Sequence, residues 1–414
     1  MDQARKDRIF ALAKEQSQQQ TLRFFDELSE EQQEHLSGQL EAVDFDMIRA
    51  AMTMENRAEK SLITPLKTLT VAEAEKDLGE YRAIGEKMLR EGKVAALVLA
   101  GGQGSRLGFD GPKGTLNVGI NRELYLFEIL LGNMRENIRN AGNVRDLHFC
   151  VMTSDQNHQA TVSFFEDHGY FGYPKEMIHF FRQDMAPALT HEGKILLEAK
   201  DSLSLAPNGN GGWFTSMQRC GLLDLLKKDG VEWINVVSVD NVLQNIADPV
   251  FLGATIAKEC YAGAKVIAKV NPDERVGAIC YRNGRPSVVE YSELTEEMRN
   301  AKNAEGEYLY NFGVTLNYLF HISETEEAAK NQLPIHRADK KIKCIDEAGN
   351  PVNPEAPNAY KLEYFIFDIL EAFDDVLSME CIREHEFAPI KNREGADSLE
   401  TARALLVART GIAL

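Results

Sequence analysis

Residues 94–119 read VAALVLAGGQGSRLGFDGPKGTLNVG, and they combine two local signals. The first part, Val94–Ala100, is apolar throughout, too short for an isolated helix and followed by glycine, so it predicts a buried β-strand. The loop after it contains closely spaced glycines: Gly101, Gly102, Gly104, Gly108 and Gly111. Such a loop can approach a bulky group and turn its amide N–H groups toward it. Because Arg106 and Lys113 lie in the same loop, we predict that it binds a polyphosphate.

The glycine spacing excludes the two most familiar nucleotide-binding loops. A P-loop requires G-x-x-x-x-G-K-[ST], but here Lys113 follows Pro112. The dinucleotide fingerprint G-x-G-x-x-G would begin at Gly102, but Leu107 occupies its third glycine position. A purely structural glycine turn is the alternative. The apolar strand before the loop and the two cations within it favour phosphate binding over that alternative.

Composition narrows the class of protein. The chain has 414 residues, of which 44% are hydrophobic and 27% charged, as is usual for a globular enzyme. Its formal charge of −18 argues against nucleic acid or an anionic membrane as a partner, although a local cationic cluster can still bind a nucleotide. The six cysteines form no C-x-x-C motif, no run of 18 apolar residues occurs, and the first residues are charged. We therefore expect a cytoplasmic protein that does not enter a membrane.

From residue 94 onward, strand patterns alternate with helix patterns. The predicted strands are 94–100, 147–153, 178–181, 233–239 and 264–270, and the predicted helices are 124–141, 156–168, 215–228 and 249–261. Strands separated by helices form βαβ units, so we predict an α/β fold with a Rossmann-like, mostly parallel sheet. Ligands bind such sheets at the carboxyl ends of the strands, where the glycine loop, Thr153, Asp240 and Asn241 would lie.

The flanking regions have other patterns. Residues 1–92 carry apolar residues at helical spacing and predict a helical N-terminal region. Residues 93–333 would form the nucleotide- and sugar-binding catalytic domain, with antiparallel strands in 276–320. Residues 334–414 would form a small C-terminal module. Four prolines between 334 and 357 indicate a linker into it, followed by helices near 360–373 and 396–408.

Asp240 is the candidate metal ligand, because it ends the apolar strand WINVVSVD. A carboxylate in this position can hold Mg²⁺ over a nucleotide phosphate, since Mg²⁺ takes one or two carboxylates together with phosphate oxygens. The alternative is an aspartate that only caps a helix or shapes a turn.

Several motifs together resemble the sugar-nucleotide pyrophosphorylases. The loop G-G-x-G-x-R-L-G followed by Pro112-Lys113-Gly114 is most similar to the branch that makes UDP-N-acetylglucosamine and related UDP-sugars. The segment APNGNGG resembles that family's PDGNGG, with Asn208 in place of Asp, and FFRQDMAPAL resembles FFQQGMLPA. Further similar segments are NPDERVGAI, VVEYSE, NFGVTLN, YKLEYFIFD and FAPIKN. The resemblance extends from about residue 90 to 410 and implies a GT-A-like nucleotidyltransferase core.

The resemblance also implies roles for individual residues. The expected nucleotide contacts come from Gly101, Gly102, Gly104, Gln183 and Gly209, with Gln183 at the uracil. The expected sugar or phosphate contacts come from Asn210, Gly277, Glu290, Asn311 and Lys361. The expected catalytic residues are Arg106, Lys113 and Lys391, and Asp240 would bind Mg²⁺.

The reaction that follows is the condensation of UTP with a sugar 1-phosphate to give a UDP-sugar and pyrophosphate. A phosphate nucleophile is already largely dianionic at neutral pH, so the reaction needs charge neutralisation more than a general base. The lack of H-E-x-x-H and G-x-S-x-G motifs gives the alternatives of a hydrolase or a zinc enzyme little support. A nucleotide-sugar sensor without catalysis is disfavoured, because Arg106, Lys113 and Asp240 are all present.

The sugar is the open question. The motifs favour N-acetylglucosamine 1-phosphate, and glucose 1-phosphate is the alternative. Phe312 replaces a small residue after Asn311, and Val314 replaces an asparagine of the similar proteins. Both changes could reshape or close the space for an N-acetyl group.

Overall fold

The computed structural model describes residues 2–53, 61–142, 145–330 and 333–414. Contacts group the chain into two units. The smaller unit comprises Met1–Glu59, Asp184–Gly212 and Leu333–Ile366, and the larger comprises Lys60–Gln183, Trp213–Gln332 and Phe367–Leu414. These groupings cross the three expected segments, 1–92, 93–333 and 334–414, and whether those segments act as domains stays a prediction. None of the helices within the described ranges is long and apolar enough to cross a membrane.

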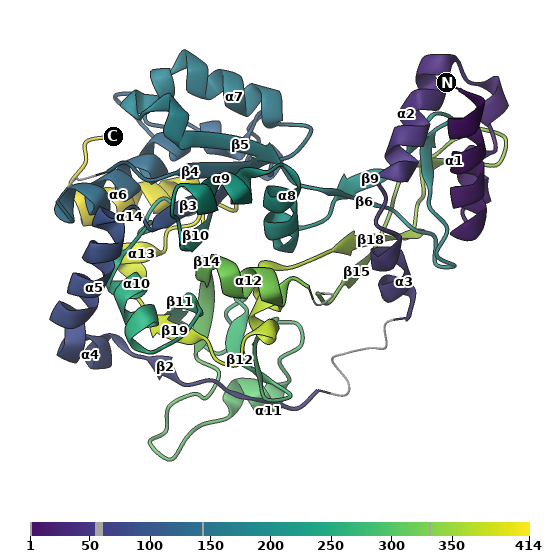
Figure 1. Ribbon diagram of the computed structural model, residues 1–414. Helices are drawn as coiled ribbons and strands as arrows, with labels where there is room; N and C mark the ends of the chain where they lie inside the picture. Colours follow the sequence, from purple (N-terminus) through teal and green to yellow (C-terminus); the bar gives the residue numbers. More distant parts are fainter. Residues whose placement is uncertain (1, 54–60, 143–144, 331–332) are drawn as a thin grey trace. The chain divides into compact units, whose positions relative to one another are not determined.

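The larger unit is built on one wide sheet (Figure 1). Its main path, in spatial order, is β2 (Thr68–Leu69), β19 (Leu377–Glu380), β11 (Ala262–Ala268), β14 (Phe312–His321), β10 (Trp233–Ser238), β3 (Val94–Leu99), β4 (Phe149–Thr153) and β5 (Ile178–Arg182). Neighbours along this path pair in parallel, except that β14 runs antiparallel to both β10 and β11. The predicted α/β fold with a mostly parallel sheet is confirmed.

An antiparallel group extends the sheet next to β14. It contains β12 (Ala278–Arg282), which pairs with β1 (Ile63–Pro65), β13 (Arg285–Val289) and β14. The short helix α11 (Glu296–Asn300) lies between β13 and β14 in the chain. This agrees with the antiparallel character expected for residues 276–320.

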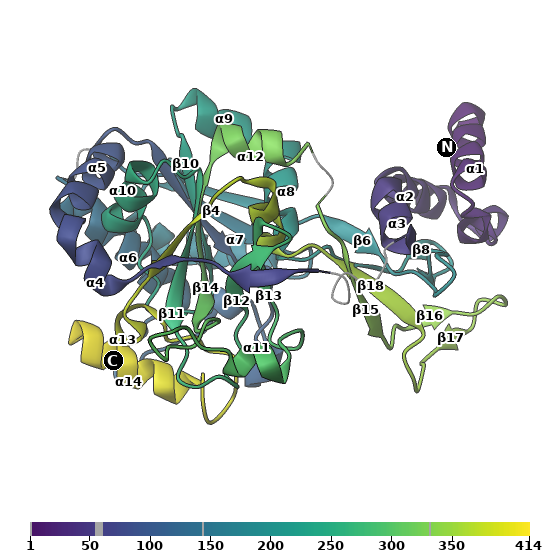
Figure 2. The same ribbon diagram turned by 90° about the horizontal axis from the view of Figure 1, so that it is seen from below.

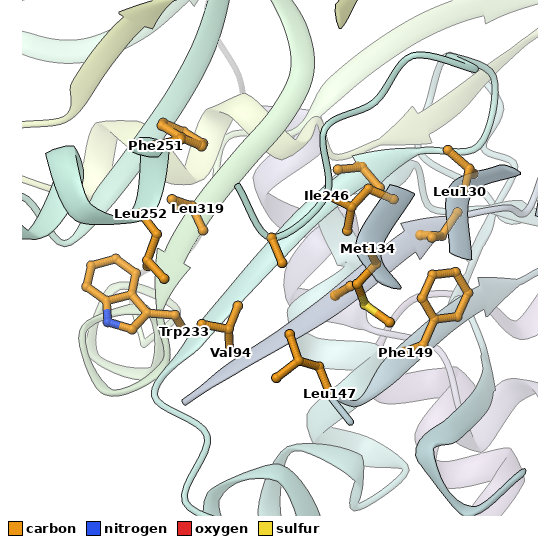
Figure 3. Packing of buried hydrophobic residues seen from close by; sticks show 14 of the residues in the cluster. Val94, Leu130, Met134, Leu147, Phe149, Trp233, Ile246, Phe251, Leu252 and Leu319 are labelled. Carbon is orange, nitrogen blue, oxygen red and sulfur yellow. The ribbon is translucent and has the colours of Figure 1, made fainter. Parts of the chain in front are cut away.

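Helices cover the sheet of the larger unit. They are α4 (Val71–Ala74), α5 (Leu78–Arg90), α6 (Leu126–Asn140), α7 (His158–Asp167), α8 (Trp213–Arg219), α9 (Leu222–Lys228), α10 (Pro249–Ala257), α12 (Ile322–Ala328), α13 (Arg383–Glu386) and α14 (Leu399–Thr410). The sequence predicts one helix over 215–228, but Gly221 adopts φ +76 and separates α8 from α9. Apolar residues of β3, β4, β10, β14, α6 and α10 form the main core (Figure 3).

Two glycines allow α5 and α10 to pack at close range, and the helices lie side by side in both views (Figures 1 and 2). A Cβ atom at Gly85 would lie 1.9 Å from the carbonyl oxygen of Pro249. A Cβ atom at Gly253 would lie 1.7 Å from the carbonyl oxygen of Tyr81. Any larger residue at either position would therefore force the helices apart, which fixes the start of α10 relative to the sheet.

The smaller unit contains helices and short strand pairs. Its helices are α1 (Gln3–Glu15), α2 (Glu30–Glu41) and α3 (Phe45–Thr53). Its strand pairs are β6 (Met185–Pro187) with β9 (Leu205–Pro207), β7 (Leu197–Ala199) with β8 (Ser202–Leu203), β15 (His336–Lys340) with β18 (Ala359–Glu363), and β16 (Cys344–Ile345) with β17 (Pro351–Val352). Buried residues from all three helices share a core with Leu189, Leu203 and Leu362.

Two expectations for the C-terminal part are wrong. The stretch 334–357, expected as a linker, carries strands β15, β16 and β17. The helix expected near 360–373 is replaced by strand β18 and a 3₁₀ helix over Ile366–Ala372. Pairing with β15 satisfies the backbone of residues 359–363 and places Leu362 in the core of the smaller unit. The partner strand β15 lies about 20 residues earlier in the sequence, and the local spacing of apolar residues on which the helix prediction was based does not reveal such a pairing.

Candidate active site

The glycine loop follows β3 and closes on itself. The N–H of Gly104 donates to the carbonyl oxygen of Gly111 at 3.0 Å, and the N–H of Lys113 donates to that of Gly102 at 3.2 Å. The buried Asn157, at the start of α7, donates through Nδ2 to the carbonyl oxygens of Ala100 and Gly102. The loop is therefore fixed to the carboxyl end of β3 by hydrogen bonds, as a preorganised phosphate site requires.

Gln183 lies directly against the beginning of this loop. A Cβ atom at Gly101 would be 2.5 Å from its Nε2, so a larger residue at this position would displace the amide. Gln183 follows β5, is buried, and donates its backbone N–H to the carbonyl oxygen of Thr153. The structure thus brings together a predicted base contact and a predicted phosphate-loop residue.

Two groups of the loop face open space. A Cβ atom at Gly102 would meet no heavy atom within 4 Å. Arg106 is exposed, and among the described residues its guanidinium makes no hydrogen bond or ion pair. The outer side of the loop is therefore open at Gly102, and the guanidinium of Arg106 is available to an anionic ligand.

Lys113 and Asp240 form an ion pair at the carboxyl ends of the neighbouring strands β3 and β10. The Nζ atom of Lys113 lies 3.4 Å from Oδ2 of Asp240, and both side chains are more than four-fifths buried. The hydroxyl of Ser238 donates to the other carboxylate oxygen at 2.7 Å. Asp240 is therefore held by neighbours rather than used as a helix cap, while its strand β10 pairs with β3, the strand before the glycine loop.

The segment FAPIKN, residues 387–392, is hydrogen-bonded to the same edge of the sheet. Ile390 donates its N–H to the carbonyl oxygen of Asp240 at 2.8 Å, and Ala388 donates its N–H to Oδ1 of Asn241 at 2.8 Å. Lys391 comes next in the chain, is exposed, and has its Nζ 5.7 Å from the ring centre of Phe387. The predicted catalytic lysine therefore follows directly after the residues that bind the end of β10.

Arg393 is a cation that the sequence analysis did not identify. Its guanidinium lies about 4.0 Å from where a Cβ atom of Gly108 would be, so it borders the glycine loop. The segment and the loop also share a hydrophobic cluster, in which Leu107 and Phe109 pack near Ala388 and Ile390. In the sequence, Arg393 is marked by its position two residues after Lys391.

Gly277, Glu290 and Asn311 lie around the start of β14. The carbonyl oxygen of Gly277 accepts the N–H of Val314 at 3.0 Å. A Cβ atom at Gly277 would lie 3.6 Å from Oε1 of Glu290, so these two predicted sugar contacts are neighbours. The carbonyl oxygen of Asn311 accepts the N–H of Lys269 at 2.8 Å, which ties it to the end of β11.

Lys269 is a second candidate that sequence reasoning missed. It is 8% exposed, and among the described residues its ammonium makes no hydrogen bond or ion pair. Burial lowers the pKa of Lys269, while the carboxylate of Glu274 acts in the opposite direction. A buried cation next to Asn311, without an ion-pair partner, is suited to bind an anionic ligand. A lysine after the apolar strand β11 is the signal that could have revealed it.

Three predicted residues belong to the smaller unit. Gly209 has φ +88, and a Cβ atom there would lie 2.3 Å from the carbonyl oxygen of Tyr364, so glycine is required. Oδ1 of Asn210 accepts the N–H of Ile366 at 3.0 Å. Lys361 is paired with Glu363 at 2.8 Å. In this structure, the side-chain oxygen of Asn210 and the ammonium of Lys361 thus have structural partners.

The donor set is compatible with a magnesium–nucleotide complex. Within the described ranges, no cluster of three or more His, Cys, Asp or Glu side chains is arranged to bind a metal by itself. Mg²⁺ that is bound through substrate phosphates needs only one or two protein carboxylates, and Asp240 supplies one at the strand end. Asp240 therefore fits the chemistry of a shared site, and its role there stays a prediction.

Comparison with known proteins adds independent findings. The family described as UTP–glucose-1-phosphate uridylyltransferase matches residues 44–410. The chain is similar to UDP-N-acetylhexosamine pyrophosphorylase-like protein 1 of Mus musculus, with 37% identity over 334 residues, and to UDP-N-acetylglucosamine pyrophosphorylase of Saccharomyces cerevisiae, with 33% identity over 376 residues. These matches cover 78% and 87% of this chain, and 66% and 78% of the respective relatives. The chain thus spans just under two thirds of the mouse protein.

A solved structure is similar over nearly the whole chain. It is the uridine diphosphate N-acetylglucosamine pyrophosphorylase from Trypanosoma brucei, with a TM-score of 0.85 and 28% sequence identity. The match covers 99% of this chain and 85% of that one. The similarity therefore extends beyond the glycine loop to the arrangement of the sheet and its helices.

Proposed function

Because the chain belongs to the UTP–glucose-1-phosphate uridylyltransferase family of UDP-sugar pyrophosphorylases, we propose that it is a nucleotidyltransferase that condenses UTP with a sugar 1-phosphate. The products are a UDP-sugar and pyrophosphate. The observation that carries the proposal is the meeting of Lys113 and Asp240 beside a closed glycine loop at the carboxyl edge of the sheet. There, backbone amides, cations and a carboxylate converge where an α/β sheet binds nucleotides.

The loop binds the triphosphate. The amides of residues 101–104 and the guanidinium of Arg106 contact phosphate oxygens, and Lys113 neutralises charge on the leaving pyrophosphate. Lys113 also keeps the carboxylate of Asp240 oriented when no nucleotide is present. Mg²⁺, when bound, supplies further charge neutralisation between Asp240 and the phosphates.

The sugar 1-phosphate attacks the α-phosphorus in line. Its phosphate has a second pKa of about 6, so it is largely dianionic at neutral pH and needs no general base. The obstacle is repulsion between a dianion and a polyanion, which cations lower by neutralising charge and fixing the approach. Lys391 and the buried Lys269 are the cations that we assign to this role. The contacts implied for Gly209, Asn210 and Lys361 stay predictions.

N-acetylglucosamine 1-phosphate is the sugar substrate that we propose, with glucose 1-phosphate as the alternative. The support is the similarity to proteins named for N-acetylglucosamine and N-acetylhexosamine, together with the segment APNGNGG, which resembles the family's PDGNGG. The decisive experiment is pyrophosphate release from UTP with the 1-phosphates of GlcNAc, GalNAc, glucose and galactose. Release with none of the four would refute the proposed activity.

A cytoplasmic location is also part of the proposal. All six cysteines are free thiols, and four of them, Cys150, Cys260, Cys280 and Cys381, are buried. Reduced thiols of this kind are typical of a reducing compartment. Fractionation of cells that express the protein, with a cytosolic marker, tests this directly.

A further inference from the structure

Lys265 is an ammonium buried inside the sheet. It lies in the middle of β11, a strand that is otherwise made of small and apolar residues, and it is 1% exposed. Burying an isolated ammonium would cost several kcal/mol. Burial alone lowers the pKa of Lys265, but the attraction of Asp248 and Glu386 outweighs this effect and raises it. Lys265 is therefore charged in the folded protein.

Two carboxylates bind this single ammonium. Oδ2 of Asp248 lies 2.6 Å from Nζ of Lys265, and Oε2 of Glu386 is bonded to the same atom. Asp248 has a second partner, because it caps α10 by accepting the N–H of Val250. Asp248 would thus keep its place without Glu386, whereas within the described ranges no other side-chain hydrogen bond holds the carboxylate of Glu386.

Glu386 stands at the start of the segment that reaches the active-site edge. Its carbonyl oxygen accepts Nδ2 of Asn241 at 2.7 Å. Two residues later Ala388 donates to Oδ1 of the same asparagine, and Ile390 donates to the carbonyl oxygen of Asp240. The position of Glu386 is therefore transmitted to Asp240 by consecutive hydrogen bonds.

Apolar packing holds one side of this segment. Phe387 packs with Ile267 and Cys381, and Ala388 and Ile390 belong to a larger buried cluster. On the other side, Glu386 lines two adjoining cavities of about 460 Å³ each. α13 has two ionic anchors, because Arg383 at its start pairs with Glu274 and Glu386 at its end pairs with Lys265. The bond to Lys265 is the one that holds the end of α13, next to the segment that reaches Asp240.

We propose that Lys265 is a positioning residue for the transferase reaction. By holding Glu386, it fixes the position of the segment 387–391, so that Asp240 and Lys391 lie where they can act on the substrate phosphates. This inference rests on the proposed function, because it assumes roles for those two residues. It assigns no contact with substrate to Lys265 itself. A displacement of about 1 Å in groups that neutralise charge can cost up to about 100-fold in rate.

The test compares three variants of the full-length chain. Glu386→Ala leaves a balanced pair of Lys265 and Asp248, so it should fold, and we expect kcat to fall by at least about tenfold with a smaller change in KM for UTP. Glu386→Gln keeps an oxygen that can accept from Lys265 and should retain most of the activity. Lys227→Met removes the exposed ion pair of α9 with Glu326 and serves as the matched control without effect.

A second readout separates positioning from general damage. Hydrogen exchange at the amides of Ala388 and Ile390 should become faster in Glu386→Ala, but should stay slow in Glu386→Gln and Lys227→Met. Wild-type kcat and unchanged exchange in folded Glu386→Ala would overturn the proposal.

The variant Lys391→Ala distinguishes the two levels of inference. Full activity in Lys391→Ala would remove the role of that lysine and, with it, this inference. Lost activity in Lys391→Ala beside full activity in Glu386→Ala would overturn the positioning role and leave the proposed function intact.

Discussion

Nζ of Lys113 lies 3.4 Å from Oδ2 of Asp240, which joins the glycine loop after β3 to the carboxyl end of β10. The pair places one cation and one anion at the point where the proposed reaction must separate pyrophosphate from a nucleotide. At this distance the hydrogen bond is long, so an incoming magnesium–nucleotide complex can exchange it for shorter, charge-assisted bonds. The two residues can therefore be tested separately, Lys113 by the turnover at saturating UTP and Asp240 by the Mg²⁺ dependence of the rate.

The first prediction concerns the loop cations. Arg106→Ala and Lys113→Ala should each lower kcat by about 10²–10³-fold, which corresponds to about 3–4 kcal/mol of lost transition-state stabilisation. Arg106 is exposed, and in the described part of the chain Asp240 is the one side-chain partner of Lys113, so neither change should unfold the protein. The measurement is steady-state kinetics with saturating UTP, with a thermal melt as the control. Near-normal turnover in both variants would exclude the loop from the mechanism.

The second prediction concerns magnesium. Asp240→Asn should raise the Mg²⁺ concentration needed for half-maximal rate, because a neutral amide is a poorer ligand for a hard dication than a carboxylate. The amide can still accept the hydroxyl of Ser238, so the local structure should be kept. Titration of the rate with Mg²⁺ at fixed UTP gives the answer. An unchanged Mg²⁺ dependence would make Asp240 a residue of the turn alone.

The third prediction concerns Lys269. Lys269→Met should raise KM for the sugar 1-phosphate by about tenfold and change KM for UTP much less, since one charged hydrogen bond is lost in a buried place. Burial lowers the pKa of this lysine, so its charge is lost at a lower pH than for an exposed lysine. The value of kcat/KM for the sugar phosphate should therefore fall as the pH rises through that lowered pKa.

Lys269→Arg is the matched variant for the pH profile. Its guanidinium stays protonated, so the alkaline fall assigned to Lys269 should disappear if the variant binds the sugar phosphate. Lys87→Met, on the exposed face of α5, controls for loss of an unrelated lysine. Equal KM values for sugar phosphate in the wild type and Lys269→Met would contradict the assignment.

The sequence predicted the sheet of the larger unit better than the smaller unit. Strands such as Val94–Leu99 are apolar over their whole length, so their type can be recognised locally, and a parallel sheet then places their carboxyl ends at one edge. That argument was enough to expect the glycine loop and Asp240 together. The pairing of β15 with β18 was missed, because it depends on a partner that local spacing does not show.

Site residues without a motif were missed for a related reason. Asn157, Lys269 and Arg393 belong to none of the motifs, and their positions beside a strand end or after Lys391 are weak signals until the fold places them at the site. Asn157 holds the glycine loop through two carbonyl oxygens, a relation between α7 and β3 that no single window of sequence contains. The sequence thus predicted the residues that sit in motifs and missed those that support them.

The fourth prediction concerns stability in acid. Nδ1 of His148 lies 2.8 Å from Nε2 of His179, at the end of the sheet opposite the glycine loop. Burial lowers the pKa of both histidines. For His179, burial and the charge of the neighbouring His148 together lower the pKa to about 4. The folded state thus favours neutral rings, while the unfolded chain binds protons near pH 6.5. Their contribution to stability is complete above about pH 6.5 and is lost as the pH falls toward about 4.

Urea unfolding at two pH values measures this effect. The free energy of unfolding should decrease between pH 7.5 and pH 5, and the decrease should be smaller in His179→Gln, which cannot take up a proton. His191→Gln, at an exposed histidine, is the control and should show the wild-type decrease. An identical pH dependence in His179→Gln and the wild type would assign the acid sensitivity to other groups.

The last prediction concerns the sugar. Phe312 is the first residue of β14, is only partly buried, and follows Asn311 directly. Val314 lies on the same side of the strand and binds the carbonyl oxygen of Gly277 through its backbone N–H. If these side chains line the sugar pocket, the acetamido N–H and C=O of GlcNAc would lack partners there, at a cost of about 1–3 kcal/mol for each buried group. Phe312→Ala should therefore raise kcat/KM for GlcNAc 1-phosphate relative to glucose 1-phosphate if the ring narrows the pocket, and Phe312→Leu, which keeps much of the volume, should raise it less. Both ratios are measured with UTP saturating, and a ratio unchanged by either substitution would show that Phe312 does not select the sugar.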